Sequence, residues 1–212
     1  DAEEPTVTNP YLSALLLFGV GAFAGVLNVI AGGGSFLTVP LLIFLGLPPT
    51  VANGTNRLAI ITQNVGASWS FHRRGLLPRD WLMLAAPIAV VGALLGTIAA
   101  VRIGDLAFQR VLAVSMVAIT AWTLWHHASP PPGGASAPPT GARRWAYLAG
   151  FFLVGLYGGF IQAGVGFMIL ALTTAGGLDL IRGNAVKVTL LLVFTPLALL
   201  LFAATGKVDW PL

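Results

Sequence analysis

The chain has 212 residues, of which 57% are hydrophobic and 8% are charged, and its formal net charge is +4. A mean hydropathy of +0.87 is more than a soluble core needs, so the composition excludes an ordinary soluble domain and predicts an all-α polytopic membrane protein. The absence of cysteine excludes disulfides and thiolate metal sites. Most basic residues lie in short loops between apolar segments, which indicates membrane topology and not nucleic-acid binding.

Apolar segments bounded by charge, proline or glycine are the expected helices. In chain order they cover residues 11–30, 35–47, 51–71, 81–101, 107–125, 145–161, 166–178 and 181–204. The segments that begin at Ser35 and Gly166 have only about 13 residues each, or roughly 20 Å as helices. A hydrocarbon core is about 30 Å thick, so we expect these two helices not to cross it.

A run of three glycines, Gly32 to Gly34, interrupts the first apolar region. As one helix, residues 11–46 would be roughly 54 Å long, so we expect a hairpin that bends at the glycines. Each glycine weakens a helix by roughly 1 kcal/mol relative to alanine and frees backbone groups, which hydrocarbon tolerates only where protein or a cavity satisfies them. The run is predicted either to break a helix at a transport site or to line a close helix crossing.

A proline- and glycine-rich segment divides the chain. The predicted organisation is a first transmembrane repeat over residues 1–127, a cytoplasmic linker over 128–144 and a second transmembrane repeat over 145–212. The second repeat has no counterparts of segments 81–101 and 107–125, so we expect about two further helices to belong to it.

The two halves match at a constant offset of 131 residues. Both show the order of helix, glycine break, short helix, Gly-Leu turn and asparagine-bearing helix. The matched pairs include Gly33 with Gly164, Phe36 with Phe167 and Asn53 with Asn184.

Arginines in the loop 72–80 and in the linker, set against an acidic N-terminal tail, predict the orientation. By the positive-inside rule the loop and linker are cytoplasmic and the N-terminus is outside. Three crossings then separate the first hairpin from the linker, so the second repeat enters from the opposite side. We therefore expect an inverted repeat of helical bundles, each with a broken, glycine-interrupted hairpin, as in many secondary transporters.

Two cations, Arg57 and Lys187, lie inside predicted membrane helices that contain no carboxylate. Such a charge costs about 2.5 to 3.5 kcal/mol on insertion scales and usually marks a functional site. Two cations without acidic partners indicate an anionic substrate. The alternative is that both side chains extend along their helices to the membrane interface.

Neutral hydrogen-bonding residues surround these cations in the sequence. Helices that begin after the glycine breaks would also present free N–H groups and the positive ends of their dipoles, which bind anions. Each polar side chain has the alternative of a simple interhelical hydrogen bond. Besides the two cations, the candidate substrate-binding residues are Asn28, Gly33, Gly34, Ser35, Asn53, Thr55, Asn56, Gln162, Gly164, Gly166 and Asn184.

No catalytic residue, cofactor or metal site is predicted. An intramembrane enzyme would need a nucleophile with a base, or paired acids, at membrane depth, and the apolar segments contain neither. The histidines lie at segment ends without other ligands at metal-binding spacing. The expected partners are a small anion and the lipid bilayer, and no nucleic acid is expected. The sequence does not decide whether the protein forms a homo-oligomer.

Residues 25–42 followed by 46–56, and residues 155–167 in the second half, resemble the two signatures of the TauE/SafE sulfite-exporter family. The resemblance implies a multi-pass transporter in the bacterial inner membrane that exports a small sulfur-containing anion such as sulfite or a sulfonate. We expect it to act by alternating access. An anion channel, or a membrane assembly protein without transport activity, is the alternative.

Overall fold

The computed structural model describes residues 10–30, 32–125 and 137–211, with side chains from residue 18 onward. The described residues form eight helices and no strand, as the apolar pattern predicts. They are α1 (Pro10–Ile30), α2 (Ser35–Phe44), α3 (Pro49–Arg73), α4 (Arg79–Arg102), α5 (Asp105–Trp125), α6 (Gly141–Phe160), α7 (Val165–Ala175) and α8 (Leu180–Ala204).

Helix α6 begins at Gly141, inside the segment predicted to be linker. The predicted apolar segment starts only at residue 145, because two arginines precede it. The helix itself starts earlier, since a helix can extend past the hydrocarbon into the membrane interface. Residues 128–136 of the predicted linker and the N-terminal tail, residues 1–9, lie outside the described residues.

The chain is a polytopic membrane protein. Three of the described helices, α4, α5 and α8, are long and apolar enough to cross a membrane. Helices α2 and α7 have only 10 and 11 residues, so neither reaches across the hydrocarbon.

Each half contains one hairpin of a long and a short helix, with α1 and α2 in the first half and α6 and α7 in the second. The backbone φ is 89° at Gly32 and 79° at Gly164, a conformation that side-chain-bearing residues rarely adopt. Both turns therefore require glycine, and the prediction of glycine-interrupted hairpins is confirmed.

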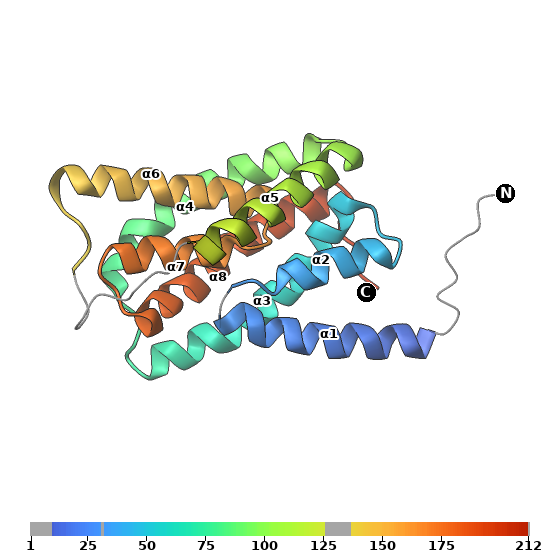
Figure 1. The fold of residues 1–212 in the computed structure, drawn as a ribbon, viewed down its shortest axis with the longest axis horizontal. Helices are drawn as coiled ribbons and strands as arrows, with labels where there is room; N and C mark the ends of the chain where they lie inside the picture. Colours follow the sequence, from blue (N-terminus) through green and yellow to red (C-terminus); the bar gives the residue numbers. More distant parts are fainter. Residues whose placement is uncertain (1–9, 31, 126–136, 212) are drawn as a thin grey trace.

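The two halves run through the molecule in opposite directions (Figure 1). Helix α1 enters from the right of the view, α2 returns to the right and α3 crosses to the left. Helix α6 enters from the left, α7 returns to the left and α8 crosses to the right. The ribbon thus has the inverted order that the charge pattern predicts.

Helices α4 and α6 pack with their backbones in contact. A Cβ atom on Gly92 or Gly96 would collide with the backbone of α6, and one on Gly155 or Gly159 would collide with that of α4. Small residues in both helices permit this approach, as is common between membrane helices. Larger side chains complete the core of α4, α6, α7 and α8, among them Trp81, Phe151, Ile169, Leu190 and Phe194.

We predict that Gly155→Leu destabilises the protein, because its side chain would collide with the α4 backbone at Ala89. Overpacking of this kind costs about 1 to 3 kcal/mol. The measurement is the thermal unfolding midpoint of the purified protein in detergent. Gly66→Leu is the control, since an added Cβ there meets nothing within 4 Å. Equal midpoints for the two variants would contradict the predicted backbone contact.

Candidate functional site

The two glycine breaks touch in the interior of the molecule. A Cβ atom on Gly32 would collide with the backbone of Gly166, and one on Gly166 would collide with that of Gly32. Helices α2 and α7 begin next to this contact, at Ser35 and Val165. The positive ends of two short helices therefore lie near one another.

Contacts around the breaks are reciprocal. An added Cβ on Gly33 would lie 2.8 Å from the Phe167 ring, and Gly164 packs in the same way against the Phe36 ring. The centroids of the two rings are 6.2 Å apart. Both the glycines and the phenylalanines are pairs related by the offset of 131 residues, so the contact has the approximate two-fold symmetry of the repeats.

Arg57 of α3 is fully buried and binds the end of α6. Its Nη2 donates to the carbonyl of Gly159 at 2.6 Å, and its Nη1 donates to Oε1 of Gln162 at 2.9 Å. Contacts of 3.4 Å reach the carbonyl of Gly158, and the ring of Phe202 lies 4.7 Å from the guanidinium carbon. The last carbonyls of a helix have no intrahelical partner and carry the negative end of its dipole, so Arg57 stabilises the broken end of α6.

Lys187 of α8 does the same for the other break. Its Nζ donates to the carbonyls of Asn28 and Val29, both at 2.9 Å, where α1 ends. Each cation therefore holds the interrupted first helix of the opposite repeat. Both side chains are 0% exposed, so neither extends to the membrane interface.

The formal charges of these two cations meet no acid among the described residues. The ion pair in the described part of the chain joins Arg182 Nε to Asp179 Oδ2 at 3.8 Å, at the partly exposed start of α8. Carbonyl oxygens are dipoles without net charge, so they satisfy hydrogen bonds but leave the cationic character of the site in place. The Nε of Arg57 is buried and has no partner.

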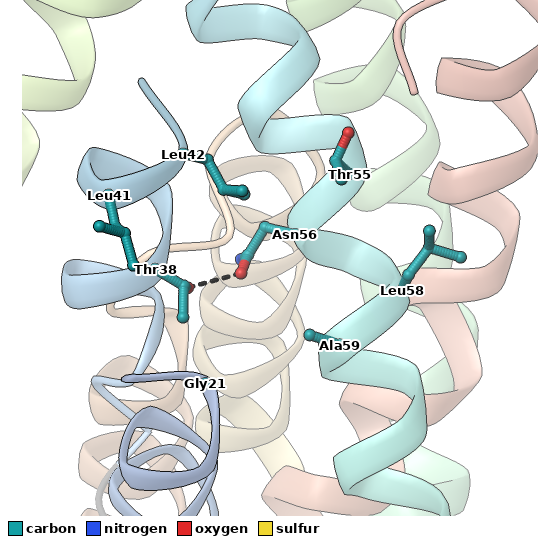
Figure 2. A pocket seen from close by; sticks show the side chains of 8 residues that line it. All are labelled: Gly21, Thr38, Leu41, Leu42, Thr55, Asn56, Leu58 and Ala59. Atoms are coloured by element: carbon teal, nitrogen blue, oxygen red, sulfur yellow. Dashed lines mark hydrogen bonds between the residues drawn. The ribbon is translucent and has the colours of Figure 1, made fainter. Parts of the chain in front are cut away.

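The neutral candidates of the first repeat join α1, α2 and α3. Asn56 donates from Nδ2 to Oγ of Ser35 at 3.0 Å and accepts at Oδ1 from the Thr38 hydroxyl (Figure 2). Asn28 donates from Nδ2 to Oε1 of Gln63 at 3.0 Å. These are the interhelical hydrogen bonds that the alternative interpretation predicts, and they also hold polar groups beside the first break.

Other candidates lie around the end of α6. Asn53 donates from Nδ2 to the carbonyl of Phe160 at 3.0 Å, and Gln162 donates from Nε2 to the Thr195 hydroxyl at 2.8 Å. Asn53 and its counterpart Asn184 each leave Oδ1 buried without a partner. Buried unpaired polar atoms are rare in folded proteins, and here they recur at matched positions of the two repeats.

The remaining candidates are placed apart from one another. Gly34 packs against the backbone of α1 at Ala24, so it serves helix contact. The Thr55 hydroxyl accepts from the backbone N–H of Asp209 at 2.8 Å, so it binds the C-terminal segment.

Sequence reasoning missed several partners of the candidates. Thr38, Gln63 and Thr195 bind candidate residues from neighbouring helices, and no pattern in the sequence distinguishes them from other polar residues. The contact between Phe36 and Phe167 could have been predicted, because the two residues are matched between the repeats.

A cavity of about 160 Å³ lies between α1, α2 and α3 (Figure 2). Its wall includes the hydrogen-bonded pair Thr38 and Asn56. The full lining is Gly21, Thr38, Leu41, Leu42, Thr55, Asn56, Leu58 and Ala59. A larger groove of about 530 Å³ between α5, α6 and α7 is lined by apolar and aromatic residues, and none of the candidate residues lines it.

Comparisons with known proteins cover nearly the whole chain. Residues 17–212 match the family described as "Sulfite exporter TauE/SafE". A "Probable membrane transporter protein" of Haemophilus influenzae is 32% identical over 202 residues, which are 92% of this chain and 76% of that protein. The "Probable membrane transporter protein YfcA" of Escherichia coli is 29% identical over 213 residues, with 96% and 75% covered. No solved structure gives a significant match.

We predict that Arg57→Met lowers the stability of the folded protein, because the carbonyls at the end of α6 lose a charged donor. Hydrogen bonds to charged groups contribute about 1.5 to 3 kcal/mol each. Chemical unfolding in detergent measures the loss. Arg110→Met, an exposed arginine on α5, is the control. Full stability of Arg57→Met would show that the arginine does not stabilise the broken helix.

Proposed function

Because the chain belongs to the sulfite exporter TauE/SafE family, we propose that it is a secondary transporter that exports a small sulfur-containing oxyanion, such as sulfite or a sulfonate. The family and the membrane transporters among its relatives support the transporter class. The observation that carries the choice of an anion is the pair of fully buried cations, Arg57 and Lys187, without acidic partners among the described residues.

In this proposal the anion binds beside the meeting point of the two breaks. Arg57 and Lys187 provide long-range attraction in a low-dielectric interior. The starts of α2 and α7 offer the positive ends of helix dipoles. The oxygens of the bound anion would be oriented by Asn28, Asn53, Asn184 and Gln162. The anion would compete with the backbone carbonyls of α1 and α6 for the hydrogen bonds that the two cations donate.

The contact between the inverted halves supports a proposal of alternating access. Gly32 and Gly166 touch, and beside them the ring of Phe36 packs on Gly164 while the ring of Phe167 packs on Gly33. A rocking motion of one repeat against the other would open this contact toward one side of the membrane at a time. The phenylalanine pair is the proposed barrier.

The proposed setting is the bacterial inner membrane, with the N-terminus outside and the linker cytoplasmic. The apolar segments contain no carboxylate that could relay protons. Any proton that accompanies export therefore travels on the substrate, for instance as bisulfite.

We predict that Lys187→Gln reduces sulfite transport about tenfold or more in proteoliposomes. Glutamine keeps N–H donors for the carbonyls of α1 but removes the charge, and a charged hydrogen bond contributes about 1.5 to 3 kcal/mol. Arg182→Gln, a partly exposed cation on the same helix, is the control and should transport normally. Normal sulfite flux through Lys187→Gln would refute the proposed role, and flux without saturable counterflow would favour a channel.

We predict that tying the phenylalanine positions together stops transport. The chain has no cysteine, so the double variant Phe36→Cys with Phe167→Cys carries the protein's two thiols. A short bifunctional thiol reagent should join them, because the native rings are 6.2 Å apart, and should abolish sulfite flux. The same reagent on each single variant should leave the flux of that variant unchanged. Undiminished flux in the cross-linked double variant would argue against a moving barrier at this contact.

A further inference from the structure

The cavity between α1, α2 and α3 distinguishes the first repeat from the second. At Gly21, Thr38 and Ala59 the first repeat places small residues on the cavity wall. At the positions 131 residues later the second repeat has Phe152, Ile169 and Leu190. The side chains of Ile169 and Leu190 are 0% exposed and belong to the core packed against α4. The space that the second repeat fills with its own side chains is therefore partly open in the first.

One wall of the cavity is polar and leads to the break. Thr38 binds Asn56, and Asn56 binds Ser35, the first residue of α2 after the glycine run. Asn56 also occupies the position that matches Lys187 in the second repeat. The cavity thus adjoins the proposed anion site through a neutral amide and not through a cation.

The other walls are apolar, with Leu41, Leu42 and Leu58, and no charged residue lines the cavity. Pockets that hold drug-sized ligands have roughly 300–1,000 Å³. A volume of about 160 Å³ therefore limits the occupant to a few non-hydrogen atoms. These walls suit a short hydrocarbon group whose polar end points along Thr38 and Asn56 toward the break.

We propose that this cavity binds the carbon chain of an organic sulfur oxyanion, and that Gly21, Thr38 and Ala59 determine how long that chain can be. The inference rests on the proposed function, since the charged head of the same molecule lies at the breaks. Each methylene group moved from water into the cavity should tighten binding about fourfold until the space is filled.

A lipid chain suits the cavity less well than a substrate tail does. Thr38 and Asn56 put polar groups on its wall, whereas the larger groove between α5, α6 and α7 is lined by apolar and aromatic residues, including Ile119, Leu153 and Leu172. Hydrocarbon without a polar end gains nothing from the hydroxyl and the amide.

The test fills the cavity with the residues that the second repeat carries. The double variant Thr38→Ile with Ala59→Leu is reconstituted in proteoliposomes, and half-saturating concentrations are measured for sulfite and for methane-, ethane- and propanesulfonate. In the unchanged protein we expect the half-saturating concentration to fall as the sulfonate lengthens. In the double variant we expect the half-saturating concentration to rise at least tenfold more for propanesulfonate than for sulfite.

Matched variants separate filling from other effects. Thr38→Val removes the hydroxyl without filling the cavity and should keep the dependence on chain length. Val65→Leu adds a methylene group on the exposed side of α3 and should change nothing. Gly21→Ala narrows the cavity without a collision, since an added Cβ meets nothing within 4 Å. It should shorten the longest accepted sulfonate even if the double variant does not fold.

The outcomes separate this inference from the proposed function. Transport of sulfite with no dependence on sulfonate length in the unchanged protein would overturn the inference and leave the transporter standing. A chain-length dependence that persists in the folded double variant, or an equal loss for sulfite and sulfonates, would also overturn it. Failure of the unchanged protein to transport any of the four anions would defeat the proposed function itself.

Discussion

Backbone carbonyls at the end of an interrupted helix must be satisfied where no water is present, and this constraint organises the molecule. Helices α1 and α6 end at Ile30 and Phe160, close to the buried contact of Gly32 with Gly166. An unsatisfied carbonyl in hydrocarbon costs several kcal/mol. Lys187 and Arg57 remove that cost by reaching across to the opposite repeat. The breaks can therefore exist only because the two halves are packed together.

The same arrangement links the fold to the proposed transport. The cations that stabilise the broken helices are also the charges that would attract an anion, and their present partners are neutral oxygens. In the proposed mechanism substrate oxygens would replace carbonyl oxygens as acceptors, which would couple binding to a change of helix position. The close contact of Gly32 with Gly166 lies at the boundary between the inverted halves, where the proposed exchange would take place.

Symmetry between the halves is incomplete, and the differences are informative. The second repeat is packed by α4 through glycine contacts and large core residues such as Trp81 and Phe194. The first repeat carries smaller residues at Thr38 and Ala59 and retains a cavity with a polar wall. Two repeats that share the same order of helices therefore differ in packing, since one is filled by large side chains and the other retains a cavity.

The sequence by itself determined the helices, the two breaks and the short second helices through hydropathy and glycine placement, and it determined the inverted order through charge near the helix ends. The tertiary structure alone decided what the buried cations touch. Arg57 binds Gly159 and Lys187 binds Asn28, partners 102 and 159 residues away in the chain. Their acceptors are main-chain carbonyls, which every residue possesses, so no side-chain pattern could reveal them.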